Sequence, residues 1–488
     1  MTTPAQVGPI LFARGVRGEA LRLGAVTVLA RHRQPAALRP MDGAPVEPVA
    51  LATLQDRVVW RHDFDLPAAS GAFYSLDGIR HPVAADLTGD LRIAYVSCNG
   101  RERGDEAQPA VARNRLWHRL GEDHARAPFG LLLHGGDQLY ADEVLGAHPA
   151  LAAWAAAGLD EKAAHPFTEA AEAAAEAYLL RRYAALYAQP EIARLLARVP
   201  SVMMWDDHDI FDGWGSHPAT LLDSPVGRGL FALARRMFLL FQAGTAAPPP
   251  DQGASLTTRL AFPGFDVVAP DLRSERRPDR VLGPAGWAAL TRALAADPAP
   301  RRRLLMSSVP LLGPRLSWIE RLIGVVPKLR RYEDDLRDQW QSRAHRAEWQ
   351  RLLRLLEETA ARDGAALTVL SGEIHLATRA EMPLNRTANR TANGAATLHQ
   401  LVASGIVHPP PPAAYARALG WLAALGEDPL PGQPIRLHPL PGRRRIYTAE
   451  RNYLTLERRG ERGGERGAER WTAVWHLEDS GPTPPLEI

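Results

Sequence analysis

Hydrophobic and polar residues follow two different patterns along the chain. Up to about residue 86, short apolar runs are separated by Pro, Gly and Asp turns, and no long helical period occurs. The runs read PILFARGV, LRLGAVTVLA, RVVWRHDFDL and AFYSLDGI. They predict a small all-β, sandwich-like domain over residues 1–86, with HPVAADLTGD (81–90) as the junction to the rest of the chain.

From residue 87 onward, apolar runs of strand length alternate with segments long enough to hold a helix. The expected strands are 92–97, 129–134, 202–205, 266–269, 304–307 and 367–371. The clearest helical patterns are the Ala-rich segment 167–198, which has capping residues, and the segment 344–362, where leucines and Trp349 recur every three or four residues. Because parallel strands need long connections, this alternation predicts an α/β unit with a partly parallel sheet that is buried on both faces.

The C-terminal part returns to a β pattern. RIYTAERNYLTLER and ERWTAVWHLED both have strand character, and the charged, Gly-rich RGERGGERGAER between them predicts a hairpin loop. We expect this late segment, residues 440–488, to pack back onto the preceding domain. NRTANRTANG (385–394) is interpreted as a polar surface loop.

Composition sets limits on the class of protein. The 488 residues are enough for a large core, and the net charge of +3 shows no dense basic stripe of the kind that binds nucleic acid. No apolar run reaches the roughly 20 residues of a membrane span. The N-terminal sequence has no secretory signal pattern, so we expect a cytoplasmic protein, or an extracytoplasmic one if this N-terminus was trimmed. Cys98 is the one cysteine, which excludes an internal disulfide.

Residue types that bind metals follow four of the expected strands. Cys98 follows the first, Gly136-Asp137 the second, Asp206-Asp207-His208-Asp209 the third, and Gly372-Glu373-Ile374-His375 the last. Ligands of α/β sheets bind at the carboxyl ends of the strands. We therefore expect these segments to meet at one edge.

The stretch MMWDDHDIFDG (203–213) places four aspartates within seven residues. Carboxylates so close repel one another unless a positive charge lies among them. A polar turn at the end of a strand is the simpler alternative for this stretch alone.

Six motifs, in this order, resemble the PhoD-type alkaline phosphatases and phosphodiesterases, a branch of the calcineurin-like metallophosphoesterases. They are SCN (97–99), GDQLY (136–140), WDDHD (205–209), DLRSER (271–276), SSVP (307–310) and SGEIH (371–375). The resemblance covers roughly residues 90–410. It implies a metallophosphatase fold, in which two central sheets form a β-sandwich flanked by helices, over residues 87–488.

The resemblance also implies a site with several metal ions. Cys98 would be a thiolate ligand of iron, Asp137 a bridging ligand and Tyr140 a phenolate ligand. Asp207 would bind metal at the position where the wider superfamily has Asn, and His208 would face the phosphate as an acid. Thiolate and phenolate suit ferric iron, so we expect a coloured protein.

The last motif would complete the metal shell with Glu373 and His375. The family usually has Asp at the position of Glu373, and the extra methylene puts direct ligation by this residue in doubt. The superfamily's first motif, Asp-x-His, is missing here, which leaves Cys98 as its substitute. Besides ferric iron, carboxylates favour one or more divalent cations, calcium first, with magnesium, manganese or zinc as alternatives.

Further residues are expected to act on the substrate. Asp209 could orient the His208 imidazole. Arg273 could bind phosphate through two hydrogen bonds, or it could instead form a salt bridge with Asp271 or Glu275. Asn99 and Trp214 are candidate substrate-binding residues, although Trp214 could equally belong to the core.

The sequence therefore predicts a phosphoric ester hydrolase that attacks mono- or diesters with a metal-bound hydroxide. The partner would be a small phosphorylated substrate, and no nucleic-acid partner or membrane span is indicated. A phosphodiesterase acting on phospholipid headgroups or nucleic-acid ends is a second enzymatic option. A protein that binds phosphate or metal without turnover is the alternative of another class. The sequence does not give the oligomeric state.

Overall fold

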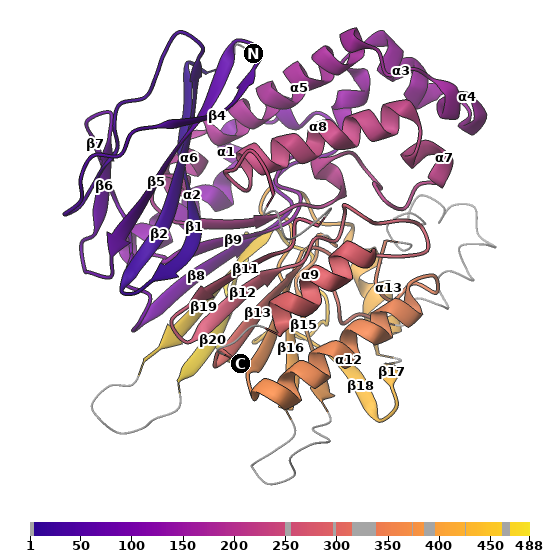
Figure 1. The fold of residues 1–488 in the computed structure, drawn as a ribbon. Helices are drawn as coiled ribbons and strands as arrows, with labels where there is room; N and C mark the ends of the chain where they lie inside the picture. Colours follow the sequence, from indigo (N-terminus) through magenta and orange to yellow (C-terminus); the bar gives the residue numbers. More distant parts are fainter. Residues whose placement is uncertain are drawn as a thin grey trace.

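A computed structural model describes residues 4–248, 255–295, 299–314, 338–372, 374–384, 396–424, 426–460 and 469–488. Within this part of the chain, two large sheets lie against each other, with helices on their outer sides (Figure 1). The expected α/β fold class and the two-sheet arrangement are confirmed. Among the described helices, none is long and apolar enough to cross a bilayer.

The first sheet has 11 strands in the order β21-β20-β19-β8-β9-β10-β1-β2-β5-β4, with β22 paired to β20. Its N-terminal strands are β1 (Gln6–Arg17), β2 (Ala20–Ala30), β4 (Val49–Leu54) and β5 (Arg57–Pro67). Its central strands are β8 (Leu91–Val96), β9 (Leu131–Gly135) and β10 (Ser201–Met204). Its C-terminal strands are β19 (Asn452–Arg459), β20 (Arg470–Leu477), β21 (Gly481–Pro482) and β22 (Leu486–Glu487).

The second sheet has eight strands in the order β11-β12-β13-β14-β16-β15-β18-β17. The strands are β11 (Thr258–Phe262), β12 (Phe265–Ala269), β13 (Arg302–Ser307), β14 (Ala366–Ser371), β15 (Thr378–Leu384), β16 (Ala396–Val402), β17 (Glu427–Leu430) and β18 (Gln433–His438). A third, small sheet joins β3 (Arg39–Pro40), β6 (Phe73–Leu76) and β7 (Ile79–Pro82).

The N-terminal region is all-β, as expected, but its main strands continue the first large sheet. β1 pairs in parallel with β10, where Phe12 lies opposite Ser201. The late β segment also joins this sheet, because β19 pairs with β8. The sheet therefore runs across the expected boundary at residue 86, and that boundary stays a prediction.

Helices cover the outer faces of both sheets (Figure 1). The longest are α2 (Arg115–Arg126), α5 (Glu169–Tyr187), α8 (Pro225–Phe241), α9 (Pro284–Leu294), α12 (Arg346–Asp363) and α13 (Ala413–Ala423). The shorter ones are α1 (Ala110–Arg113), α3 (Pro149–Ala156), α4 (Leu159–Ala164), α6 (Pro190–Leu196) and α7 (Ala219–Leu222). The pattern at 167–198 forms two helices, α5 and α6, because Pro190 has no backbone N–H and begins the second helix.

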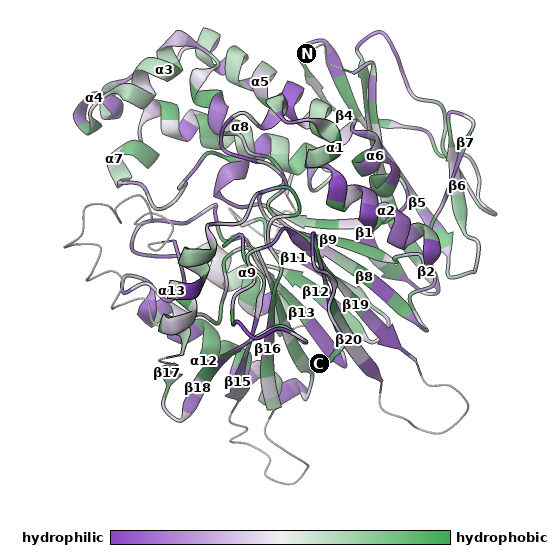
Figure 2. Cartoon of the chain, turned by 180° about the vertical axis from the view of Figure 1, so that it is seen from behind, coloured by the Kyte–Doolittle hydropathy of each residue, from purple (hydrophilic) through white to green (hydrophobic). Residues whose placement is uncertain are grey.

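The strand period explains how one sheet serves two cores. On β8, Ile93 and Tyr95 belong to the cluster between the sheets, whereas Ala94 and Val96 belong to the cluster under the helices. Hydrophobic residues lie along the central strands, and outer helices such as α2 carry many hydrophilic ones (Figure 2). Burial on both faces fixes the register, so the loops after β8, β9 and β10 reach a defined place.

The parallel strands place the loops that carry the chemistry. β8, β9 and β10 are parallel neighbours, and so are β12, β13, β14 and β16. Their carboxyl ends therefore point the same way within each sheet. The predicted loop at 385–394 and most of the loop at 459–470 lie outside the described residues.

Candidate metal centre

The loops after the parallel strands of both sheets surround one cavity of about 520 Å³. Predicted residues at this cavity are Asp137, Asp207, His208 and His375. Cys98 and Tyr140 lie directly behind it, since Cys98 Sγ is 3.5 Å from Asp137 Oδ2 and the Tyr140 ring stacks on His208 at 4.3 Å. The structure thus brings together the strand ends that the sequence singled out.

Three of these residues have a left-handed backbone. Cys98, Asp137 and His375 have φ values of 54°, 53° and 51°, and each follows the carboxyl end of a strand. Such values are uncommon for residues other than glycine and concentrate at functional sites. Gly136, with φ 102°, precedes Asp137, and a Cβ there would lie 2.9 Å from the Cβ atoms of Asp206 and Ser308.

Three carboxylates form the centre of the site. Asp137, Asp206 and Asp207 offer oxygen atoms that lie within 4.8 Å of one another. Asp137 Oδ1 and Asp206 Oδ2 are buried and have no hydrogen-bond partner among the described residues. Burial and the neighbouring Asp206 raise the pKa of Asp137 well above its usual range. A cation between these oxygens would remove both the repulsion and the missing contacts.

A second group adds Asp212 to this edge of the cavity. Asp207, His208 and Asp212 also have potential ligand atoms within 4.8 Å of one another. Burial raises the pKa of Asp212 to about 6. The Asp207 carboxylate is held in place by the backbone N–H of Gly213, which donates to Oδ2 at 2.8 Å.

Cys98 and Tyr140 place a thiol and a phenol beside the carboxylates. Cys98 is fully buried, and its sulfur lies 3.2 Å from the Ser404 hydroxyl and 3.5 Å from Asp137 Oδ2. The Tyr140 hydroxyl is buried without a hydrogen-bond partner among the described residues, and burial raises its pKa well above the usual range. Gly100 leaves room for this ring, because a Cβ there would meet Tyr140 Cδ2 at 2.5 Å.

His208 is oriented by Asp142, so its predicted pairing with Asp209 is wrong. Asp142 Oδ1 and Oδ2 lie 3.0 and 3.1 Å from His208 Nδ1. Burial lowers the pKa of His208, but Asp142 and Asp207 outweigh this effect and raise it well above the ordinary value. Asp142 also accepts the backbone N–H of Asp212 at 2.6 Å, which fixes the carboxylate in position.

Asp209 instead holds the backbone of the loop. Its Oδ1 accepts hydrogen bonds from Leu139 N and Gln242 Nε2, at 2.9 and 2.8 Å, and its Oδ2 accepts the N–H of Asp206 at 2.9 Å. Asp206 and Asp209 together form a capping box around the short turn Asp207–Asp209. Both oxygens of Asp209 are therefore occupied by contacts within the fold.

Arg273 cannot act as the predicted phosphate ligand, because every side of its guanidinium is occupied. The side chain is fully buried and forms a short contact through Nε with Asp206. Its other nitrogens bind Asp338 at 2.9 and 2.6 Å, the Trp214 carbonyl at 3.0 Å and Asp207 at 3.5 Å. Neither salt bridge considered from the sequence, to Asp271 or Glu275, is the one formed. Arg273 instead neutralises the acids that line the site.

The two predicted substrate-binding residues point into the fold rather than the cavity. Trp117 Nε1 donates to Asn99 Oδ1 at 2.8 Å. The Trp214 ring stacks on Phe231 at 5.2 Å and is buried. Neither Asn99 nor Trp214 is among the described residues that line the cavity, and Trp214 takes the core position that the sequence left open; substrate binding by this pair stays a prediction.

The last predicted motif contributes His375. Its backbone N–H donates to Ser404 Oγ at 2.9 Å, and its Nδ1 is buried without a partner among the described residues. Glu373, the other predicted ligand of this motif, lies outside the described residues.

Sequence reasoning missed four residues at this site. They are Asp142, Asp338, Glu102 and His408. All four line or support the cavity. His408 had a usable signal, since it follows the apolar run LVA and a Gly, like the other strand ends. The contacts of Asp338 depend on three distant segments and have no local signal.

Comparison with known proteins identifies the family of the central segment. Residues 113–332 match the family described as PhoD related phosphatase. This segment of the chain is similar to PhoD-related phosphatases. Asp137, Tyr140, Asp207 and His208 lie inside the matched segment, whereas Cys98 is outside it. The family resemblance stated from the motifs is confirmed.

Two further matches extend beyond this domain. The chain is 23% identical, over 456 residues, to an uncharacterized protein of Saccharomyces cerevisiae, YGR266W; the match covers 75% of this chain. The chain spans 65% of the length of that curated relative. The match to a solved structure of PhoD covers 100% of this chain and 93% of the PhoD chain. Its TM-score of 0.57 at 11% identity shows a common fold.

Proposed function

We propose that this protein hydrolyses phosphate esters, mono- or diesters, with cations held by the cavity residues. The observation that supports this proposal best is the carboxylate cluster beside a carboxylate-oriented histidine. Asp137, Asp206 and Asp207 converge, and His208 bound to Asp142 faces the same cavity. Its small phosphorylated substrate would enter this cavity.

The donor atoms fit metal ions. Asp137 Oδ1, Asp206 Oδ2 and the Tyr140 hydroxyl are buried without partners among the described residues. Carboxylate oxygens suit calcium, magnesium or manganese, while the Cys98 thiolate and the Tyr140 phenolate suit ferric iron. We assign Cys98, Asp137 and Tyr140 to iron, and Asp137, Asp207 and His375 to divalent cations. When bound, such cations neutralise phosphate charge and make a water molecule acidic.

His208 is the proposed proton donor to the leaving oxygen. Asp142 accepts a hydrogen bond from Nδ1–H of His208, so the proton transferred to the leaving oxygen is the one on Nε2. The carboxylates of Asp142 and Asp207 favour the protonated ring, as a general acid requires. Arg273 keeps Asp206 and Asp207 at fixed positions from behind.

The remaining wall of the cavity indicates which kind of ester would fit. Part of it is apolar and consists of residues such as Leu312, Leu419, Tyr447 and the prolines 409–412. Leu419 and Tyr447 belong to a hydrophobic cluster between α13 and the loop after β14. An ester with an apolar or aromatic organic group would bury surface against this wall. We therefore propose esters of this kind as the preferred substrates.

Hydrolysis of simple esters tests the proposal. The full chain is stripped with a chelator, reloaded with iron and calcium or manganese, and assayed with an aryl phosphate, a bis-aryl phosphate and glycerol phosphate. We expect turnover of at least one aryl ester and slower turnover of glycerol phosphate. Tight phosphate binding without any turnover would instead support a binding protein.

Two variants connect the activity to the site. Asp137→Asn should lower both metal content and activity, whereas His208→Ala should lower activity by about 100-fold or more at nearly unchanged metal content. Asp160→Asn and His118→Ala, at exposed positions on α4 and α2, are the matched controls. Equal losses of metal and activity in His208→Ala would make His208 a metal ligand instead.

A further inference from the structure

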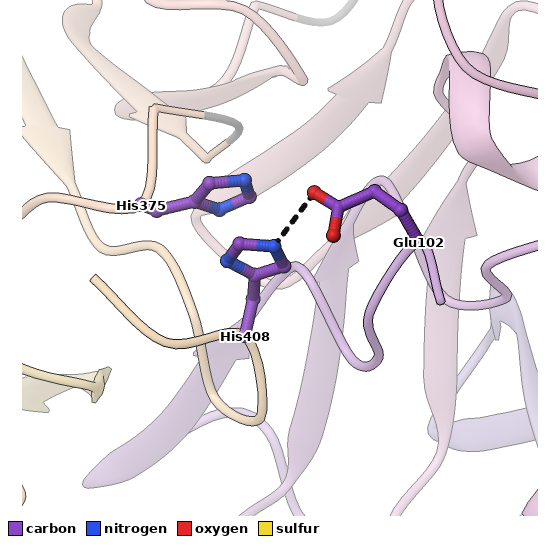
Figure 3. A group of neighbouring side chains, drawn as sticks. All are labelled: Glu102, His375 and His408. Carbon is purple, nitrogen blue, oxygen red and sulfur yellow. Dashed lines mark hydrogen bonds and ion pairs between the residues drawn. The ribbon is translucent and has the colours of Figure 1, made fainter. Parts of the chain in front are cut away.

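Three side chains other than Asp137, Asp206 and Asp207 form a second group at the wall of the cavity. Glu102, His375 and His408 offer potential ligand atoms within 4.8 Å of one another (Figure 3). They come from the loops after β8, β14 and β16, so both large sheets contribute. The hydrogen bonds of His408 and the surroundings of His375 determine what this group can bind.

The backbone fixes the tautomer of His408. Its Nδ1 lies 2.8 Å from the carbonyl oxygen of Pro409, which can only accept, so Nδ1 carries a proton. In a neutral ring Nε2 then has a lone pair. That nitrogen lies 2.9 Å from Glu102 Oε1, a second electron-pair donor. Two such donors face each other at this distance only when a cation, either a proton or a metal ion, lies between them.

His375 supplies a third electron pair. Its ring stacks on His408 with centroids 3.5 Å apart and planes 16° apart (Figure 3). Two parallel rings this close repel each other if both are charged. The Nδ1 atom of His375 is buried and has no partner among the described residues, so it is free of any contact that would compete with a metal ion.

We infer that Glu102, His375 and His408 form a binding site for a divalent transition metal ion such as Zn²⁺. Two imidazoles and one carboxylate are a set that such ions favour over calcium. The donation from His408 Nδ1 to a backbone carbonyl is the contact that typically orients a metal-binding histidine. The Glu102 side chain is 45% exposed, which gives the ion a path from solvent.

This site is distinct from the carboxylate cluster and goes beyond the proposed function, because binding there needs no turnover. His375 is the shared residue, and its two ring nitrogens can serve ions on different sides. An ion at this wall would put a further positive charge beside a phosphate group in the cavity.

Zinc binding to the full chain tests the inference. Chelator-treated wild type, Glu102→Gln and His408→Asn are titrated with Zn²⁺ by calorimetry, and bound zinc is counted by elemental analysis after dialysis. We expect both variants to lose one zinc equivalent or to bind it at least tenfold more weakly. Glu122→Gln and His118→Asn are matched controls, because these residues form an exposed Glu–His pair at 3.5 Å on α2.

The outcomes separate this site from the proposed catalytic centre. Asp137→Asn should retain the zinc equivalent that Glu102→Gln and His408→Asn lose. Unchanged zinc binding in both variants would overturn the inference even if the wild type hydrolyses esters. Conversely, the wild type could lack hydrolytic activity while Glu102→Gln and His408→Asn still lose the zinc equivalent. That result would support the zinc site and refute the proposed function.

A measurement on the wild type covers the case of a misfolded variant. Nitrogen NMR of the zinc-saturated chain reports whether His408 Nε2 carries a proton or a metal ion. We expect the metal-bound signature, with loss of the Nε2 proton on addition of Zn²⁺. A proton that persists at saturation would mean that His408 and Glu102 form a simple ion pair, and the inference would fail.

Discussion

The carboxylate of Asp142 lies 3.0 Å from Nδ1 of His208, although the two residues are 66 positions apart in the chain. Asp142 comes from the loop after β9, and His208 from the turn after β10. The parallel pairing of these strands therefore sets the orientation of the imidazole. Any role of His208 in proton transfer depends on this contact.

Asp142→Asn tests the contact. Because Asp142 raises the pKa of His208, its neutralisation should lower that pKa. A general acid works in its protonated form, so the alkaline limb of the rate profile should move to lower pH. We expect kcat to fall at least about tenfold with unchanged metal content. Asp160→Asn is the control; a lower kcat without a shift of the profile would contradict the proposed role.

Asp209→Asn should act on stability instead. The substitution replaces one acceptor oxygen by an NH₂ group that faces a backbone N–H, of Leu139 or of Asp206. One buried donor then loses its partner, which costs about 2 kcal/mol of unfolding free energy. Denaturant unfolding of the metal-free chain measures the loss. If the variant were as stable as wild type but impaired in proton transfer, the result would support the predicted pairing of Asp209 with His208.

Arg273→Lys distinguishes a supporting arginine from a phosphate ligand. Lysine keeps the charge but cannot bind Asp206, Asp207 and Asp338 at once, so we expect a loss on the order of 3 kcal/mol in stability. Arg277→Lys is the control, since Arg277 forms one partly exposed ion pair with Asp223. A higher KM for the phosphate ester at unchanged stability would show that Arg273 binds substrate after all.

Local patterns predicted most of the strands, because burial on both faces produces apolar runs that end where the strands end. The expected strand at 367–371 is β14 (Ala366–Ser371), and that at 304–307 is β13 (Arg302–Ser307). The convergence of Asp137, Asp207 and His375 could be predicted for the same reason, since parallel strands end at one edge.

Contacts between distant segments could not be predicted in this way. Arg273 is occupied by carboxylates from positions 206, 207 and 338, and no local pattern records that convergence. Adjacency suggested Asp209 as the partner of His208, but the tight turn directs Asp209 to backbone N–H groups instead. Trp214 stacks on Phe231 of α8, so its burial depended on packing between separate elements.

Tyr140→Phe tests the iron assignment by two opposite effects. Ferric iron bound by thiolate or phenolate absorbs visible light, so the iron-loaded wild type should be coloured, and Tyr140→Phe should lose the phenolate band. Metal-free Tyr140→Phe should be about 1 kcal/mol more stable than wild type, because the buried hydroxyl has no described partner. Cys98→Ser should lose the thiolate band.

A colourless, fully active preparation without iron would contradict that assignment. Destabilisation of metal-free Tyr140→Phe would instead give the hydroxyl a structural role. Visible absorption, iron analysis and thermal unfolding of the same samples measure both effects. Tyr178→Phe provides the control for the colour, because this tyrosine belongs to the core under the helices and not to the cavity.

His134 makes the stability of the fold sensitive to acid. It is 1% exposed, binds Gln138 through Nδ1 at 2.8 Å, and burial lowers its pKa from 6.5 to about 4. Between these values the unfolded chain binds a proton that the folded chain does not, so stability falls as pH drops from about 6.5 to 4. One such group contributes up to about 1.4 kcal/mol per pH unit. His134→Gln should therefore reduce the slope of unfolding free energy against pH near pH 5, as measured by denaturant titration of the metal-free protein. The control His118→Gln, at an exposed position, should leave this slope unchanged. Equal slopes in the wild type and both variants would show that His134 is not the residue responsible.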